Sequence, residues 1–214
     1  MSPALQLLRH AFPLIPTHGF TRQTLALSVL HQPNPHTQPL SDTAINALFG
    51  EGENARRTLI EAWIDNARQH MGSKFIEEGA PRINDVLKAR LEENAQVLQH
   101  LPEAFAFLAS PQYGLPLLDP RPGMKHAFMV ADEACRIVGD TTIGTAWYVH
   151  RGSLAAIYSA AELHQLTSPR TAPAFLDTLL NASSAAKSAV DDAETFATYI
   201  GRSWAGIIRG SGVF

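Results

Sequence analysis

The sequence has little of three features that often point to function: cysteine, charge and long apolar runs. Cys135 is the single cysteine among 214 residues, which excludes an internal disulfide framework and a zinc site built from several cysteines. Only 17% of the residues are charged and the formal net charge is −3, so the molecule as a whole does not attract phosphate backbones. No window reaches the roughly 18–20 consecutive apolar residues of a membrane-spanning helix.

Signatures of catalysis and of metal binding are missing as well, so the sequence predicts no catalytic residue, metal site or cofactor. The chain has no glycine-rich phosphate loop, no Gly-x-Ser-x-Gly motif and no Glu-x-x-His pair of the di-iron type. Asp132 and Glu133 are adjacent, so on a helix their side chains diverge by about 100° and we expect a solvated face. The histidines considered as ligands lie in a Pro-rich loop or on separate predicted helices: His31, His36, His126, His150 and His164.

Residue usage favours an all-α fold. Ala and Leu are abundant, and the strict alternation of apolar and polar residues that is typical of strands is rare. Three prolines within HQPNPHTQP exclude a regular helix over residues 31–39, and a second break is predicted over residues 111–123. The predicted helices cover residues 3–15, 21 or 24 to 30, 41–49, 53–78, 81–98, 102–110, 124–139, 146–166, 171–188 and 189–209.

The order of the first helices resembles the helix-turn-helix unit of TetR-type regulators, which dimerise and bind small ligands in an α-helical second half. A DNA reader of this type needs donors on its third helix, for base edges and phosphates. Here that helix reads SDTAINALF and carries no lysine or arginine. We therefore expect a TetR-like helical bundle that does not bind nucleic acid. A ligand-responsive transcriptional regulator stays as the alternative, and salt-dependent duplex binding would support it.

Large amphipathic side chains cluster in AWYVHRGSLAAIYSAAEL, over residues 146–163. Trp147, Arg151, Leu154 and Tyr158 share one helical face, because they follow the spacing i, i+4, i+7, i+11. Trp, Tyr and Arg are the residue types most enriched at interface hot spots. Two interpretations stay open: a surface that docks a partner, or side chains that close the core at a helix entrance.

The same segment carries a family resemblance. The pattern GD…WYxxRxxLAAIYxxxEL is similar to that of the family-nine ubiquinone (coenzyme Q) biosynthesis proteins. Other parts of the chain also resemble this family: THGFT, LFG-x-G, VLKARLE, LPEAFAFL and the tail after TSPRTAP. The resemblance implies an accessory, non-catalytic homodimer with a TetR-like fold, which binds isoprenoid quinone intermediates or phospholipid. It further implies a peripheral position on the matrix side of the mitochondrial inner membrane, or on the cytoplasmic membrane face in a bacterium.

The implied partner is the di-iron demethoxyubiquinone hydroxylase, and the residues that match the family's docking patch are Trp147, Tyr148 and Arg151. The chain departs from the family pattern at two positions in this segment. Gly144 stands where the family has an acidic residue, and His150 stands where a Lys or Arg often precedes the arginine.

Apolar stripes on the later helices supply candidates for a lipid pocket. Sites between bundle helices are mostly apolar, although such residues look the same in an ordinary core. The lipid-binding candidates are Phe105, Leu108, Phe128, Met129, Ile157 and Tyr158. The last helix also has one apolar face, which suits either a membrane interface or the protein core. Its membrane-binding candidates are Phe196, Tyr199, Ile200, Trp204, Ile207 and Ile208.

These patterns divide the chain into three parts. We expect a helix-turn-helix-like unit over residues 1–52, a ligand-binding and dimerisation bundle over 53–188, and an amphipathic carboxy-terminal helix over 189–214. The first 41 residues contain two arginines and no acidic residue, as transit peptides do, but LQLLRHAFPLI reads as an ordinary first helix. We therefore expect the chain to begin at or near the mature domain.

Overall fold

A computed structural model of the chain describes residues 2–75, 79, 81–110 and 119–185. Within these residues the protein is all-α and contains no strand, as the composition predicts. The chain divides into two compact units, Met1–Asn66 and Ala67–Phe214. The sequence-based division at residues 52 and 188 stays a prediction. In the described part of the chain, no helix combines the length and the apolar character needed to cross a bilayer.

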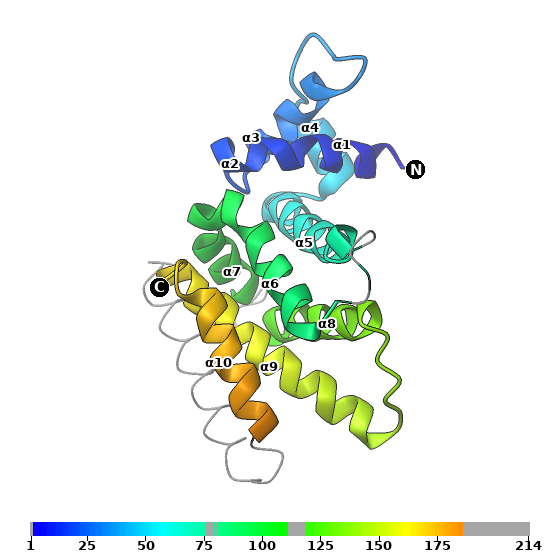
Figure 1. The fold of residues 1–214 in the computed structure, drawn as a ribbon. Helices are drawn as coiled ribbons and strands as arrows, with labels where there is room; N and C mark the ends of the chain where they lie inside the picture. Colours follow the sequence, from blue (N-terminus) through cyan, green and yellow to red (C-terminus); the bar gives the residue numbers. More distant parts are fainter. Residues whose placement is uncertain (1, 76–78, 80, 111–118, 186–214) are drawn as a thin grey trace. The chain divides into compact units, whose positions relative to one another are not determined.

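The first unit contains four short helices and the start of a long one (Figure 1). They are α1 (Pro3–Ala11), α2 (Ile15–His18), α3 (Arg22–Leu27), α4 (Asp42–Phe49) and α5 (Glu53–Gln69). The Ser41 side chain accepts a hydrogen bond from the Ala44 amide and caps α4. Phe20 packs edge-on against Trp63, with 5.7 Å between ring centroids.

Arg22 is engaged within this unit rather than free for a phosphate. Its guanidinium donates to the Asp42 carboxylate over 3.1 Å, to the Asn46 side-chain oxygen over 2.9 Å and to the Gly52 carbonyl over 2.9 Å. Helix α4, which corresponds to the recognition helix of a helix-turn-helix unit, carries no basic side chain. That this unit does not bind DNA stays a prediction.

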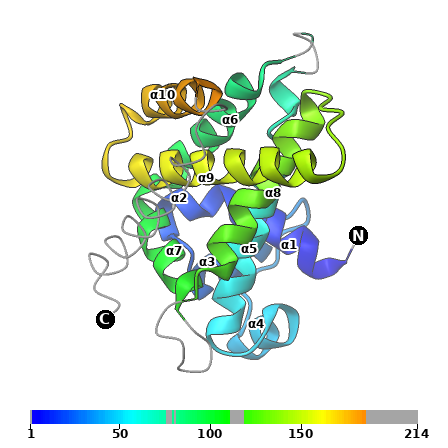
Figure 2. The ribbon, with the colours of Figure 1, turned by 90° about the horizontal axis from the view of Figure 1, so that it is seen from below.

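The second unit is a bundle of longer helices: α6 (Ile83–Glu93), α7 (Leu101–Ala109), α8 (Arg121–Ile137), α9 (Thr145–Thr167) and α10 (Ala172–Ala185). Helix α9 packs mainly between α8 and α10, and α6 also contacts both of these helices (Figures 1 and 2). Fully buried residues from these helices form one core, among them Leu87, Val130, Ala134, Tyr158 and Leu176.

Several predicted helix boundaries were wrong, and three of them have a clear local cause. The helix predicted over 53–78 ends at Gln69, because the chain turns at Gly72 and the Ser73 hydroxyl bonds to the His70 carbonyl. Helix α8 begins at Arg121, inside the predicted break, because proline costs no hydrogen bond in a first helical turn. The helix predicted over 3–15 ends at Ala11, and a 3₁₀ turn containing a proline follows.

The predicted amphipathic carboxy-terminal helix lies outside the described residues. So do all six of its candidate membrane-binding residues: Phe196, Tyr199, Ile200, Trp204, Ile207 and Ile208. By contrast, α9 and the turn before it, predicted over 146–166 with a preceding GDTTIGT break, are described and confirmed within one residue.

Candidate partner-docking site at the turn between α8 and α9

The turn that joins α8 to α9 is tied together by one carboxylate. Asp140 follows α8, and its amide bonds back to the Cys135 carbonyl over 2.9 Å. Its side chain accepts from the Thr142 amide over 3.1 Å and from the Thr142 hydroxyl over 2.7 Å. Gly139 makes the preceding bend at φ 72°, a left-handed conformation that favours glycine. These local contacts shape the turn before α9 begins.

Arg151 links this turn to α8. Its Nε donates to Asp132 Oδ1 over 2.6 Å, and its Nη1 donates to Asp140 Oδ2 over 3.0 Å. Although predicted as a docking residue, Arg151 is only 5% exposed. Its buried guanidinium therefore holds two carboxylates in place, the half-exposed Asp132 and the largely buried Asp140, because the planar donor fork suits carboxylate geometry.

The charge on Asp140 is strongly favoured in this setting. Its hydrogen bonds from Thr142 lower the pKa of the carboxyl well below its usual range, burial opposes that shift, and Arg151 adds to it. Asp140 is therefore ionised throughout the neutral range and keeps its contacts with the guanidinium.

Trp147 stands over this ion-pair cluster, near the start of α9. The Arg151 guanidinium carbon lies 4.3 Å from the centroid of the Trp147 ring, in cation–π geometry. Phe128 and Tyr148 flank the indole, with 5.9 Å and 4.8 Å between ring centroids. The predicted shared face of Trp147 and Arg151 is confirmed by this contact. The indole is half-buried and held from three sides.

The outer side of the turn presents apolar surface to solvent. Ile143 is 84% exposed, Tyr148 68% and Val149 66%, values high for such large apolar side chains. A shallow open groove of about 460 Å³ lies at this surface, lined by Thr142, Ile143, Gly144, Trp147 and Tyr148. We call the outer residues Ile143, Trp147, Tyr148 and Val149 the turn surface. It offers apolar and aromatic area next to backbone polar groups, which suits a protein contact.

Gly144 explains one of the departures from the family pattern. It precedes α9 at φ 66°, in the left-handed region that side chains disfavour. A Cβ at this position would meet nothing within 4 Å, so the backbone angle, not crowding, calls for glycine. His150 lies on the next turn of α9, with its Nδ1 3.4 Å from Asp140 Oδ2.

The predicted lipid-binding residues come from three helices and differ in burial. Met129 is 36% exposed on α8, away from the core. The others are buried or half-buried: Phe105 and Leu108 on α7, Phe128 on α8, and Ile157 and Tyr158 on α9. Tyr158 is not simply an apolar wall, because its hydroxyl donates to Glu162 over 2.6 Å. Lipid binding by this set stays a prediction.

A buried polar network near Tyr158 was not predicted from the sequence. Glu162 is 3% exposed, and its Oε1 accepts from the Tyr158 hydroxyl and, over 3.1 Å, from the Asn94 amide. His126 Nε2 lies 3.0 Å from Glu162 Oε2 and donates to it, because an ionised carboxylate can only accept. Arg90 is fully buried, with its Nη2 4.0 Å from Glu162 Oε1.

Further bonds extend this network to α6. Arg90 Nη1 donates to Asn94 Oδ1 over 2.6 Å, and Asn94 Nδ2 also donates to Gln165 Oε1 over 3.0 Å. Gln165 in turn donates to the Leu91 carbonyl over 2.8 Å. Burial by itself would raise the pKa of Glu162, but the nearby His126 and Arg90 lower it to about 2. Glu162 is therefore an ionised group inside the bundle, held by partners from three helices.

The solvated face predicted for Asp132 and Glu133 is only partly observed, because the Asp132 side chain is 50% exposed whereas that of Glu133 is 12% exposed. Asp132 pairs with the buried Arg151, and Glu133 forms ion pairs with Arg136 and, over 3.4 Å, with Arg68. The two adjacent carboxylates do point in different directions on the helix, but each one pairs with an arginine. Arg68 and Arg151 are distant in the sequence, and Arg136 lies one helical turn after Glu133. His126, expected to be solvated or hydrogen-bonded to a single partner, is buried and bonds to Glu162.

Comparison with known proteins places this site in a family context. A ubiquinone biosynthesis protein COQ9, mitochondrial, of Drosophila melanogaster is 25% identical over 168 residues, which are 75% of this chain and 48% of that protein. A protein of the same name in Schizosaccharomyces pombe is 30% identical over 88 residues, which are 41% of this chain and 33% of that protein. The family model described as COQ9 matches residues 121–195. Over this segment the chain is similar to the COQ9 family.

The COQ9 match covers the part of the chain that builds the turn surface. It contains α8, the turn, α9 and α10, together with Asp132, Asp140, Trp147 and Arg151. The chain spans about half of the length of the Drosophila COQ9 protein and a third of the yeast one. The family resemblance suggested by WYxxRxxLAAIY is thus confirmed.

Proposed function

We propose that this protein binds an isoprenoid quinone intermediate and presents it to demethoxyubiquinone hydroxylase, which docks on the turn surface. The observation that carries this proposal is the exposure of Ile143, Tyr148 and Val149 around a held indole, within the COQ9 segment. The protein acts as an accessory of ubiquinone biosynthesis and leaves the chemistry to its partner.

A lipid-binding role follows from the physical chemistry of the substrate. A polyisoprenoid tail stays in the bilayer unless another apolar surface replaces the lipid around it. We propose that a TetR-like homodimer supplies this surface between its later helices, through Phe105, Leu108, Phe128, Met129, Ile157 and Tyr158. Phospholipid is the second ligand class. The two COQ9 relatives are named mitochondrial. We propose a peripheral position on the matrix side of the inner membrane, or on the equivalent bacterial face, through residues 196–208.

The arrangement of the turn surface supports docking because its central side chain is already ordered. Trp147 is held by Phe128, Tyr148 and Arg151, so a partner that covers it does not have to immobilise it. Tyr148 contributes a rigid ring with a polar end, the type of residue that dominates interface energetics. Arg151 lies on the buried side of the Trp147 indole and positions it.

Tyr148→Ala is expected to weaken binding to the hydroxylase by about 30-fold or more, since hot-spot truncations cost at least ~2 kcal/mol. The side chain is 68% exposed and has no buried polar contact, so the fold should be retained. Isothermal titration calorimetry against the purified hydroxylase measures the change in dissociation constant. Leu48→Ala removes an exposed apolar side chain from the first unit and serves as the matched control. Equal affinities for the wild type, Y148A and L48A would remove the turn surface from the proposal.

A further inference from the structure

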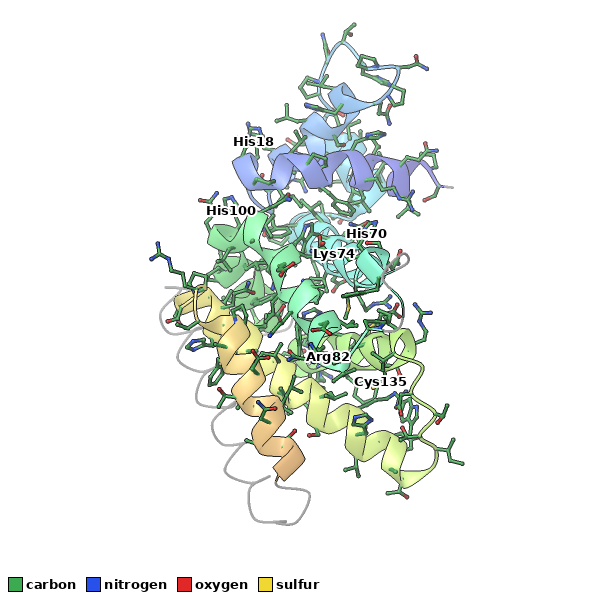
Figure 3. All side chains as sticks on the ribbon, viewed as in Figure 1. His18, His70, Lys74, Arg82, His100 and Cys135 are labelled. Carbon is green, nitrogen blue, oxygen red and sulfur yellow. The ribbon has the colours of Figure 1, made fainter. Side chains whose placement is uncertain are left out.

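Three metal-ligating side chains that are apart in the sequence meet at the base of the α8–α9 turn. Cys135 lies near the carboxy-terminal end of α8 (Figure 3), Asp140 in the turn and His150 on α9. The Cys135 sulfur, a carboxylate oxygen of Asp140 and a ring nitrogen of His150 lie within 4.8 Å of one another. This cluster is independent of the exposed residues that form the turn surface.

The donor set suits one metal in particular. Thiolate, imidazole and carboxylate are the ligands of Zn²⁺, at about 2.3 Å for sulfur and about 2.0–2.2 Å for nitrogen and oxygen. Ligand atoms at such distances around a tetrahedral ion stand between about 3 and 4 Å apart, a spacing the cluster reaches with small side-chain rotations. Three protein ligands leave a fourth position for a water molecule or another group.

His150 provides the second observation. Its Nδ1 atom is buried, points toward Asp140 at 3.4 Å, and makes no hydrogen bond within the residues that the structure describes. A buried ring nitrogen without a hydrogen bond is costly unless something satisfies it. The side chain as a whole is 39% exposed, so the ring lies at the edge of the cluster next to solvent.

The charge balance of the surrounding groups also favours a divalent cation. Arg151 pairs with two carboxylates, Asp132 and Asp140, which leaves the cluster one negative charge in excess while Cys135 is a thiol. A Zn²⁺ ion that displaces the thiol proton adds one net positive charge. The loaded cluster is therefore neutral, which favours its burial.

We propose that Cys135, Asp140 and His150 bind one Zn²⁺ ion, which joins the end of α8, the turn and α9. In the binding step the Cys135 sulfur–hydrogen bond breaks, the proton leaves to solvent, and a zinc–sulfur bond forms with no change of oxidation state. The bound ion fixes the turn on which Trp147 stands.

Titration of the chelator-treated full chain with Co²⁺, followed by displacement with Zn²⁺, tests the proposal. One Co²⁺ per chain should bind, with a sulfur-to-cobalt charge-transfer band that Zn²⁺ abolishes. Cys135→Ser should remove the band, and His150→Ala should weaken binding by more than about tenfold. His164→Ala changes a histidine elsewhere on α9, and it should leave both the band and the affinity unchanged.

The outcome does not depend on the stability of the cysteine variant. If C135S fails to fold, H150A still decides, because its side chain is partly exposed and its loss creates no core cavity. No charge-transfer band in the wild type, or an affinity that survives both C135S and H150A, overturns the site. The second result would assign the binding to histidines elsewhere in the chain.

Discussion

Glu162→Ala is expected to lower the free energy of unfolding by about 3–5 kcal/mol, the usual cost of removing one partner from a buried ion pair. Glu162 accepts from Tyr158, Asn94 and His126, and it faces a fully buried Arg90. Its loss leaves a guanidinium inside the bundle without the carboxylate that balances its charge. Urea denaturation followed by far-ultraviolet circular dichroism measures the change.

Two further variants separate the charge from the cavity. Glu92→Ala removes an exposed carboxylate that pairs with Lys74, and it should cost no more than about 1 kcal/mol. The double variant Arg90→Met with Glu162→Leu replaces the buried pair with apolar side chains, and it should recover much of the lost stability. A loss below about 1 kcal/mol in E162A would contradict the central place given to this network.

Arg151→Glu is expected to disorder the α8–α9 turn and to abolish docking of the hydroxylase. The new carboxylate would face Asp132 and Asp140, which Arg151 now holds at 2.6 and 3.0 Å. Trp147 would lose the cation beneath its ring. The thermal unfolding midpoint should fall by more than in Y148A, and near-ultraviolet circular dichroism should show the loss of fixed tryptophan packing.

Arg151→Lys provides the matched control for charge. Lysine keeps the positive charge but lacks the fork that reaches both carboxylates at once, so an intermediate loss is expected. An R151E variant with wild-type unfolding and unchanged near-ultraviolet signal would contradict the role of Arg151 as the residue that positions Trp147. Because Arg151 acts on the fold, its variants alone do not identify the docking residues, and Tyr148 is the cleaner probe.

The sequence predicted those parts of the structure that depend on local patterns. Residue periodicity and prolines located the described helices, and Ser41 or Asp42 was expected to cap α4, where Ser41 is the observed cap. The spacing of Trp147 and Arg151 correctly placed them on one face of α9. The errors in helix boundaries near Gly72 and Pro122 also had local causes. Glycine and proline occur both in turns and at helix ends, so composition alone does not distinguish the two.

Tertiary pairing is what the sequence did not reveal. Arg90, His126 and Glu162 are ordinary polar residues of three different helices, and only their packing makes them a network. One signal was available: Glu162 is the lone carboxylate of the 23-residue helix α9, in an otherwise apolar run. A single charged side chain on a buried helix requires a partner, so Glu162 indicated that a buried polar network exists but did not identify its other residues.

The burial of Arg151 was missed for the same reason. Residue type suggested an exposed hot spot, while its carboxylate partners lie 19 and 11 residues earlier in the chain. Once these contacts are known, the exposed docking area moves to Ile143, Tyr148 and Val149. The glycine at position 144 is likewise explained by its backbone angle, φ 66°, which the composition of the sequence does not reveal.

Delivery of a carried lipid tests the account most directly. The wild type and Y148A would be loaded with demethoxyubiquinone, checked for bound lipid by native mass spectrometry, and mixed with the hydroxylase under turnover conditions. Both proteins should carry the lipid, and the wild type should deliver it for hydroxylation much faster than Y148A. A wild type that neither retains nor takes up an isoprenoid lipid, or equal rates of delivery by both proteins, would contradict the account.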